Sequence, residues 1–493
     1  MTRDMLAFDL GASNGRAVLA RFDGDKLALS ELHRFPNAPY DKGGLSYWDA
    51  GALFAELREG FRAYSRDVGG ELASFGIDTW GVDYGLLDAC GGLIGDPRAY
   101  RSAVDDDMDL AWQRADKRGL FARTGIAAMS FNTVYQLYRR VRERDEQLAR
   151  ARTLLLMPDL LGYFFTGDTC TEYTNATTTN LLAADTASWD EDTLRLLDIP
   201  AHIFTAIDFP GTLRSPLKSE LANELGLKNV RLCAVGTHDT ASAVAAIPGE
   251  GSFAFCSSGT WSLFGVETET PVLTDAVFAA NFSNEGTVQG GFRPLKNIMG
   301  LWIIQECRRA WAAQGKAFSW DELVRLAKRE APFRSVIDPD DAPFFKPGDM
   351  PQKIRAYCLE TGQVAPETEG QFARCVYESL SLKYRHALET LETIKGRRID
   401  TLNIVGGGSQ NRLLNQMAAG ATGRTVITGP VEGASAGNAL MQAQALGEIR
   451  NIAEAREVIR RSFPLSVWEP RQTQAWQDAY ARLLSYMEGR KHA

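Results

Sequence analysis

Hydrophobic and polar positions along the chain predict two β-hairpins that lie far apart in sequence. Near the start, two apolar runs flank a turn of Gly, Ser and Asn in MLAFDLGASNGRAVLARFDGDKL (5–27). The same plan recurs, with Ser, Gly and Thr at the turn, in GSFAFCSSGTWSLFGVETE (251–269). Because apolar runs joined by small polar residues are typical of strands and turns, each region is predicted to be a hairpin.

The elements after each hairpin follow a common order. The first hairpin precedes a DG turn at 23–24, a third strand-like run, a helix with Asp49 as N-cap and a strand over 72–78. The apolar face of that helix consists of Leu53, Phe54, Leu57, Phe61 and Tyr64. The second hairpin precedes a long amphipathic helix near 376–394 and a strand over 401–408. The order hairpin, helix, strand therefore occurs twice, as a repeat of topology without a repeat of residues.

Length and composition predict two globular domains. The chain has 493 residues, of which 45% are hydrophobic and 24% charged. A single core stops growing at about 250 to 300 residues, so we expect two cores. The boundary is placed near residue 246, before PGEGS, where Pro and Gly interrupt the apolar runs. The predicted domains are residues 1–245 and 246–493.

Charge and apolar patterning disfavour nucleic acid and membrane as partners. The net charge of −8 is spread along the chain without a long basic block. The start, MTRDMLAFDLG, lacks the features of a signal peptide, and the apolar stretch LLLMPDLLGYFF (154–165) is too short to span a bilayer. Seven cysteines without a CxxC pair, and only five histidines, leave little for a zinc site or a disulfide framework. We therefore expect a cytoplasmic location.

One pair of cysteines leaves an alternative open. Cys358 and Cys375 could meet if their helices pack together. The plainer interpretation, two free thiols on helices, is favoured.

Both hairpin turns are candidate phosphate-binding sites. The first offers backbone N–H groups from Gly11 to Gly15, followed by the charge of Arg16. The second offers Ser258, Gly259 and Thr260. Each turn alone is typical of an ordinary surface turn, because Gly, Ser and Asn populate turns for local reasons. Their occurrence at equivalent places in two similar halves favours binding of a polyphosphate.

A third glycine-rich run, VGGGSQNRLLNQM (405–417), is predicted to pass from a strand into a helix. Glycines there would let adenine and ribose lie against the backbone, beside the positive end of the helix. The alternative is a dinucleotide site, but the third glycine of that fingerprint is missing. A P-loop and a protein-kinase HRD loop are also absent from the sequence.

The segment AVGTHDTASAV (234–244) supplies a candidate general base. An apolar strand ends in THDT, and Asp239 lies at or near the start of a small-residue helix. Taken alone, this carboxylate is better explained as a helix cap. Together with a phosphate site it becomes a candidate acceptor for the proton of a substrate hydroxyl.

These segments resemble the FGGY family of carbohydrate kinases, within the actin-like ATPase superfamily, and within it the kinases of L-rhamnulose. The resemblance runs from DLGASNGR near the start to GPVEGASAGNAL (429–440). SSGTWS and GGGSQN are shared across the family. The more selective segments are GIDTWGVD (76–83), FNTVYQL (131–137), LLMPDLLGYFFTG (155–167), EYTNATTTNL (172–181) and LKNIMGLWIIQ (295–305).

The resemblance implies an α/β fold of two ribonuclease H-like domains that flank a catalytic cleft, with ATP and Mg²⁺ as cofactors. It implies that Asp9 holds Mg²⁺ through water and that Asp239 is the proton acceptor. The ATP contacts it implies are Ala12, Ser13, Asn14, Gly15, Arg16, Thr260, Gln305 and Gly407. The sugar contacts it implies are Trp80, Gly81, His238, Asp239, Thr240 and Asn297. Without the resemblance, Asn297 and Gln305 would be interpreted as solvent-facing polar residues of helices.

One loop departs from the pattern of the family. L-rhamnulose kinases usually have Y-R-D-S-R-T where this chain has YRSAVDDDM (100–108), so Ser102 and Val104 replace an Asp and an Arg. Asp105, Asp106 and Asp107 follow. Because this loop is expected next to the sugar pocket, L-fuculose or another deoxyketose remains an alternative substrate.

The predicted function is transfer of the γ-phosphoryl group of ATP to a primary hydroxyl of a ketose, O1 of L-rhamnulose, in rhamnose catabolism. The alternative class is an actin-like assembly or chaperone-type ATPase, in which a sugar pocket would have no purpose. The expected partners are the sugar and ATP, with a monomer or a homodimer both open.

Overall fold

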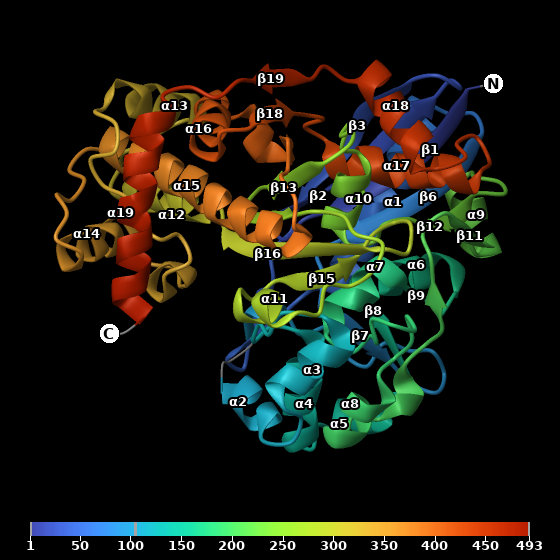
Figure 1. The fold of residues 1–493 in the computed structure, drawn as a ribbon. Coiled ribbons are helices and arrows are strands. Elements are labelled where there is room, and N and C mark those ends of the chain that lie inside the picture. Colours follow the sequence, from blue (N-terminus) through green and yellow to red (C-terminus); the bar gives the residue numbers. More distant parts are fainter. Residues whose placement is uncertain (1, 103–105, 492–493) are drawn as a thin grey trace. The chain divides into compact units, whose positions relative to one another are not determined.

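The computed structural model describes residues 2–102 and 106–491, and its chain forms two compact units (Figure 1). Neither unit is continuous in sequence. The first comprises Met1–Pro248, Glu267–Pro294 and Gly433–Phe463. The second comprises Gly249–Val266, Leu295–Glu432 and Pro464–Ala493. The sequence domains predicted to meet at residues 245 and 246 stay a prediction, since these units interleave along the chain.

The first unit is built on a six-stranded sheet with the order β11-β12-β6-β1-β2-β3. Strands β1 and β2 form the predicted first hairpin, β2 pairs antiparallel with β3, and β6 and β12 run parallel to β1. The bounds are β1 (Arg3–Leu10), β2 (Asn14–Phe22), β3 (Leu27–Pro36), β6 (Leu72–Thr79), β11 (Thr212–Pro216) and β12 (Arg231–Ala234).

The sheet of the second unit repeats this arrangement. Seven strands follow the order β15-β16-β14-β13-β17-β18-β19, of which β15 and the first residues of β16 belong to the first unit. The hairpin β13-β14 is confirmed, β14 pairs antiparallel with β16, and β17 and β18 run parallel to β13. The predicted repeat of topology is therefore confirmed strand by strand. The bounds are β13 (Phe253–Ser258), β14 (Trp261–Gly265), β15 (Ser283–Gly286), β16 (Phe292–Met299), β17 (Thr401–Val405), β18 (Thr425–Thr428) and β19 (Ser466–Trp468).

The predicted helices form, with small changes at their ends. Helix α1 (Ala50–Asp67) begins after Asp49, whose side chain accepts a hydrogen bond from the amide of Ala52. Helix α15 (Glu369–Lys395) is longer than predicted because Thr368 caps it upstream. The strand predicted over 401–408 ends at Val405, where Gly406 takes a φ of 80° and a 3₁₀ turn leads into α16 (Arg412–Thr422).

The remaining elements complete the two units. Those of the first unit are β4 (Tyr40–Lys42), β5 (Leu45–Tyr47), β7 (Tyr84–Leu87), α2 (Asp106–Trp112), α3 (Lys117–Thr124), α4 (Thr133–Arg142), α5 (Glu146–Arg150), β8 (Thr153–Leu156), α6 (Met157–Thr166), β9 (Thr171–Glu172), α7 (Tyr173–Ala176), α8 (Glu191–Leu196), β10 (Ile207–Asp208), α9 (Ser219–Leu225), α10 (Asp239–Ala245), α11 (Asp275–Ala279), α17 (Gly433–Ala445) and α18 (Ile452–Ser462). Those of the second unit are α12 (Trp302–Ala313), α13 (Trp320–Arg329), α14 (Met350–Glu360) and α19 (Thr473–Lys491).

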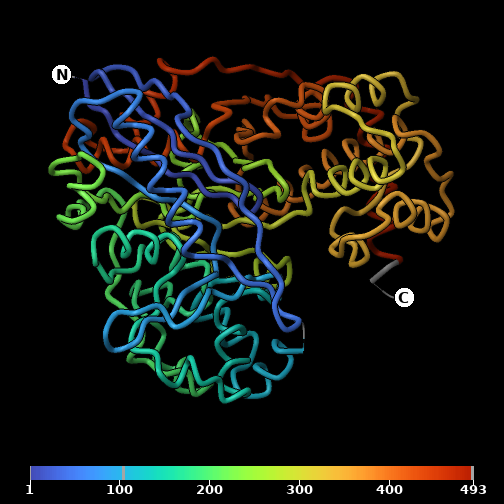
Figure 2. The backbone as a smooth tube through the Cα atoms, turned by 180° about the vertical axis from the view of Figure 1, so that it is seen from behind, coloured from blue at the N-terminus to red at the C-terminus, as the bar shows by residue number. Residues whose placement is uncertain are grey.

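Helix α17 returns late in the chain to pack on the first strands of the first unit. It contacts β1, β6 and α10, and Figure 2 shows this segment beside the N-terminal strands. Its polar face is buried on the sheet: Asn438 donates to Asp78 at 2.7 Å, and Gln442 accepts from Ser74 at 2.7 Å. The helix crosses α10 at Gly437, where an added Cβ would lie 1.8 Å from the carbonyl oxygen of Ser242.

Two features bear on cellular setting. Among the described residues, every helix is too short or too polar to cross a membrane. All seven cysteines are free. The mutual influence of the two thiols lowers the pKa of Cys358 and raises that of Cys375, so these two free cysteines lie near one another.

The close crossing of α17 and α10 requires glycine at position 437, and substitution of Gly437 tests this. We expect Gly437→Ala to lower the unfolding free energy by about 1 to 3 kcal/mol, because the new methyl group must push backbone against backbone. The matched control is Gly489→Ala in α19, where an added Cβ meets nothing within 4 Å. Denaturant unfolding of both variants tests this, and a Gly437→Ala protein as stable as wild type would contradict the tight crossing.

Candidate active site

The turn between β1 and β2 is held by its own backbone and by Asn37. The amide of Gly11 donates to the carbonyl of Asn14 at 2.9 Å, and the side chain of Asn37 donates to the carbonyl of Gly11 at 2.7 Å. The predicted run of donors therefore starts after Gly11. Gly15 is required by packing, since a Cβ there would lie 2.2 Å from the ring of Phe35.

Asp9 and Arg16 face one another across this hairpin. They are register partners of β1 and β2, and Arg16 Nη2 donates to Asp9 Oδ2 at 2.6 Å. The hydroxyl of Ser435, in α17, donates to the same oxygen at 2.9 Å. The residue predicted to hold a metal and the residue predicted to bind phosphate are therefore joined in an ion pair.

A second carboxylate, Asp78, lies next to Asp9 and was missed by sequence reasoning. The two are register partners of the parallel strands β1 and β6. Asp78 is fully buried, and its Oδ1 has no hydrogen-bond partner. Burial and the neighbouring carboxylate of Asp9 raise the pKa of Asp78 well above its ordinary value. The signal was present in GIDTWGVD, as an acidic residue within a buried strand.

Asp239 opens helix α10, yet it does not cap it. The N-cap residue is His238, and Asp239 Oδ1 accepts from the hydroxyl of Thr240 at 3.1 Å. The side chain of Asp239 is 34% exposed, so solvent or a ligand can reach it. Burial raises the pKa of Asp239, His238 opposes the shift and Asp9 adds to it. The structure therefore favours the candidate base over the capping interpretation.

The THDT segment is held in place by Glu172, which lies at the start of the selective segment EYTNATTT. Glu172 is fully buried, and Oε2 accepts from both the amide and the hydroxyl of Thr237, at 3.0 and 2.6 Å. The same carboxylate accepts from the amide and hydroxyl of Thr174 at 2.7 and 2.6 Å. Thr174 Oγ1 in turn accepts from the amide of His238 at 3.3 Å. Two distant segments are thus joined through one carboxylate.

The segment after β6 makes a tight turn at Val82. Val82 has a φ of 70°, and the amide of Asp83 donates to the carbonyl of Gly81 at 3.0 Å, which defines a γ-turn with positive φ. This conformation is strained for a β-branched residue. Side chains from other elements hold it: Thr178 accepts from the amide of Val82 at 3.1 Å, and Thr133 donates to its carbonyl at 2.6 Å.

Asp83 fixes the indole side chains beside that turn. Its Oδ2 accepts from Trp48 Nε1 at 2.7 Å, from Trp80 Nε1 at 2.9 Å and from the amide of Tyr100 at 3.1 Å. The ring centroids of Trp48 and Trp80 lie 4.1 Å apart. Burial raises the pKa of Asp83 to about 6 despite these hydrogen bonds. Trp80, predicted to line a sugar pocket, therefore has a fixed orientation.

The second unit brings together the residues predicted for the nucleotide. Thr260 Oγ1 donates to Gln305 Oε1 at 3.3 Å. The glycine-rich loop packs on the second hairpin, since a Cβ at Gly408 would lie 2.0 Å from Ser258 Oγ, whereas Gly407 has nothing within 4 Å of such an atom. The helical interpretation of Asn297 is wrong, because Asn297 lies on β16 opposite Leu263 of β14. Gln305 lies on α12 as that interpretation assumed.

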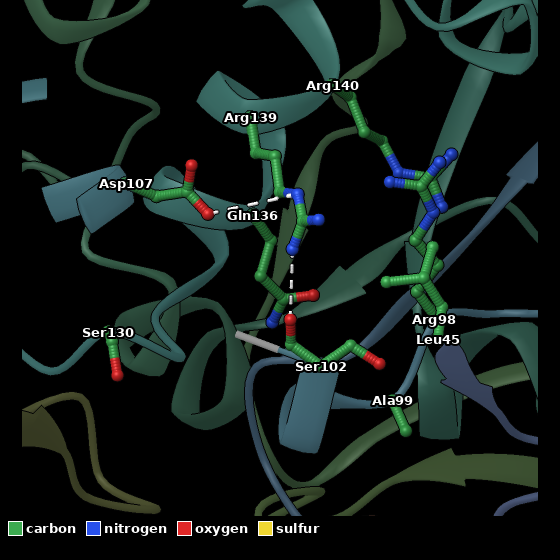
Figure 3. Close-up of a pocket in the computed structure, with 9 residues that line it drawn as sticks. All are labelled: Leu45, Arg98, Ala99, Ser102, Asp107, Ser130, Gln136, Arg139 and Arg140. Carbon is green, nitrogen blue, oxygen red and sulfur yellow. Dashed lines mark hydrogen bonds and ion pairs between the residues drawn. The ribbon is translucent and has the colours of Figure 1, made fainter. Parts of the chain in front are cut away.

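The loop that departs from the family pattern borders a pocket of the first unit (Figure 3). Val104 and Asp105 lie outside the described residues. Asp106 begins α2, and Asp107 is buried and accepts from Arg142 of α4 at 2.7 Å, so it ties α2 to α4. Arg139 donates to the carbonyl of Ser102 at 3.0 Å. The pocket is lined by Leu45, Arg98, Ala99, Ser102, Asp107, Ser130, Gln136, Arg139 and Arg140.

Each arginine of this pocket takes part in an ion pair. Arg98 pairs with Asp145 at 2.5 Å, Arg140 pairs with the same carboxylate at 3.3 Å, and Arg139 pairs with Glu143 at 2.8 Å. These ion pairs hold the arginines in place beside the loop.

The buried carboxyl group of Asp83 generates a prediction about pH. A pKa of about 6 in the folded protein, against about 3.9 in an unfolded chain, stabilises the fold at low pH, and this stabilisation is lost as pH rises through about 6. We expect Asp83→Asn to gain about 2 kcal/mol relative to wild type between pH 4 and pH 7. Urea unfolding at both pH values measures this difference. In the control, Asp88→Asn, the exposed carboxylate has a pKa lowered by the amide of Gly92, so no such gain should occur.

Comparisons with known proteins show the family and the fold of this chain. Residues 4–246 match the N-terminal domain, and residues 254–446 the C-terminal domain, of the FGGY family of carbohydrate kinases. A rhamnulokinase of Bacteroides thetaiotaomicron is 43% identical over 482 residues, which cover 97% of this chain and 98% of that protein. A rhamnulokinase of Enterococcus faecalis is 42% identical over 472 residues, which cover 95% of this chain and 94% of that protein. A ligand-bound xylulose kinase of Lactobacillus acidophilus has a TM-score of 0.83 at 15% identity, covering 99% of this chain and 98% of its own, which shows the shared fold.

Proposed function

Because the chain belongs to the FGGY family of carbohydrate kinases, we propose that it transfers the γ-phosphoryl group of ATP to O1 of L-rhamnulose, as a step of rhamnose catabolism in the cytoplasm. The observation that carries the proposal is the state of Asp239. Its carboxylate is partly exposed, and it lies at the start of α10, where His238 and not Asp239 is the N-cap residue. Buried hydrogen bonds hold the loop that carries it. The two rhamnulokinases support the choice of sugar.

In this proposal Asp239 accepts the proton of the sugar hydroxyl as that oxygen attacks the γ-phosphorus, while the bond from this phosphorus to the bridging oxygen breaks and ADP leaves. Partial burial raises the pKa of Asp239, which makes its carboxylate a better proton acceptor than a carboxylate of ordinary pKa. His238, Thr240, Trp80, Gly81 and Asn297 are the proposed sugar contacts. At position 81, packing requires glycine, since a Cβ there would lie 2.9 Å from Thr178 Oγ1. Trp80 is already held by its hydrogen bond to Asp83, and a side chain fixed in this way needs no further ordering to orient a sugar.

The proposed ATP contacts are drawn from both units. The first hairpin offers its turn and the guanidinium of Arg16, which would offset charge on the phosphates. The second unit offers the hydrogen-bonded pair of Thr260 and Gln305 and the open backbone at Gly407. The full proposed set is Ala12, Ser13, Asn14, Gly15, Arg16, Thr260, Gln305 and Gly407.

The residues around Asp9 fit a magnesium ion only if it binds together with the nucleotide. Asp9 Oδ2 already accepts from Arg16 and Ser435, and among the described residues no three acidic, histidine or cysteine side chains are grouped to hold a metal ion. Asp9 could therefore contact Mg²⁺ through water, as the family resemblance implies, but not as part of a protein cage. When bound, the ion would neutralise charge on the phosphates.

A second candidate substrate follows from the altered loop. Ser102, whose carbonyl accepts from Arg139, stands where L-rhamnulose kinases usually have an Asp. L-fuculose or another deoxyketose is the alternative acceptor. The protein is proposed to act as a monomer or a homodimer without nucleic acid or membrane partners.

Substrate preference tests the proposed function. We expect L-rhamnulose to have the highest kcat/KM among L-rhamnulose, L-fuculose and L-xylulose, because the selective segments around Trp80, Glu172 and Asn297 are intact. ADP release measured with each ketose, and with none, checks this. A tenfold higher kcat/KM for another ketose, about 1.4 kcal/mol of transition-state preference, would overturn the choice of sugar. Equal ADP release without any sugar would instead indicate an ATPase.

Removal of the carboxylate charge tests Asp239. We expect Asp239→Asn to lower kcat by about 10² to 10⁴, because the variant keeps size and shape but cannot accept the proton. Its unfolding free energy should change by no more than about 1 kcal/mol. The matched control is Asp275→Asn, which changes the first residue of another helix, α11, without loss of turnover. Near-normal turnover together with early melting of Asp239→Asn would show a structural role.

A further inference from the structure

A line of four side chains leads from the core of the first unit to Asp239. Arg293 Nη2 lies 3.2 Å from Glu285 Oε2, and the same oxygen lies 3.1 Å from His238 Nδ1. The other ring nitrogen, His238 Nε2, lies 3.5 Å from Asp239 Oδ1. Glu285 and Arg293 come from β15 and β16 and belong to neither the motifs nor the site residues predicted from sequence.

We propose that Glu285, anchored by Arg293, is a positioning residue that accepts a hydrogen bond from His238 Nδ1–H and so turns the Nε2 edge of the ring toward Asp239. This inference rests on the proposed function only for its consequence, which is alignment of His238 with the sugar beside the proton acceptor. The orientation of the ring itself is a property of the free protein.

The ring of His238 needs such a partner because its backbone contacts do not fix it. Thr174 accepts from the amide of His238, and Thr79 forms a bridge with this residue, so the main chain is held on both sides. The outer torsion of a histidine side chain is broad and nearly two-fold, however, so a fixed backbone still permits ring rotation. A carboxylate at 3.1 Å from Nδ1 favours one of the two orientations.

The pair behind the ring is itself rigid. Arg293 is completely buried, and its Nε donates to the carbonyl of Gly286 at 2.8 Å. Burial alone would raise the pKa of Glu285, but His238 and Arg293 outweigh it and keep that pKa below its ordinary value. Glu285 therefore stays an acceptor. Arg293 Nη2 also lies at hydrogen-bonding distance from His238 Nδ1, 3.4 Å, and because a guanidinium only donates, that bond would require an unprotonated Nδ1. The carboxylate is closer, at 3.1 Å, and favours a proton on Nδ1 instead.

A pair of double variants tests the inference without leaving a buried charge unpaired. Glu285→Gln with Arg293→Met removes both charges and keeps an acceptor for Nδ1–H, whereas Glu285→Leu with Arg293→Met removes both charges and the acceptor. We expect kcat/KM for L-rhamnulose at least tenfold lower in the Leu variant than in the Gln variant, with equal KM for ATP and similar melting temperatures. Equal kcat/KM in the two double variants would overturn the positioning role.

A second measurement uses the wild-type protein and no activity. In ¹⁵N-histidine-labelled protein, the His238 ring is assigned as the signal lost in His238→Gln. We expect Nδ1 to carry a proton, and an unprotonated Nδ1 would overturn the inference even if the Leu variant fails to fold. Failure of the wild type to phosphorylate any ketose would overturn the proposed function instead, and it would leave the ring measurement readable.

Discussion

A carboxylate removed from water must be surrounded by donors, and in this protein that requirement organises the site. Glu172 has no exposed surface, and four donors from Thr174 and Thr237 satisfy it. The cost of leaving such a group unpaired is several kcal/mol, so the two segments can hardly move apart without unfolding. The position of the THDT loop is therefore decided by a residue more than sixty positions earlier in the chain.

The same requirement is met at two neighbouring acidic groups, Asp83 and Asp9. Asp83 has the indoles of Trp48 and Trp80 as donors, and Asp9 has Arg16 and Ser435. The two donors in each set come from different segments of the chain, so each carboxylate ties together segments that also pack in a common apolar core. Preorganisation of this kind limits the reordering needed when a polar ligand binds. The strained backbone at Val82 is tolerated inside the same network.

Local features were predictable from sequence and long-range polar partners were not. The hairpins, the cap at Asp49 and the start of α10 follow from periodicity and turn residues within a few positions. Sequence reasoning could nominate Asp239, but it left capping open because only the folded chain shows His238 as the cap. Glu285 and Arg293 lie far from THDT in sequence and carry no motif, so nothing local marks them as its partners. For Asn297, the sequence pattern without the family resemblance favoured a helix, because an apolar segment with polar residues fits a helix as well as a buried strand.

The late return of α17 and α18 sets an order on biosynthesis. During translation the strands of the first unit emerge early, but Ser435 and Asn438, the donors to Asp9 and Asp78, emerge only after most of the second unit. Domains tend to fold as the ribosome releases them. Until α17 is synthesised, the sheet of the first unit therefore lacks the helix that covers Asp9, Asp78 and the apolar face around them. Folding of the first unit can thus begin early in synthesis but can be completed only after residues 433–463 have emerged. The core of the first unit therefore depends on a segment that follows most of the second unit in sequence.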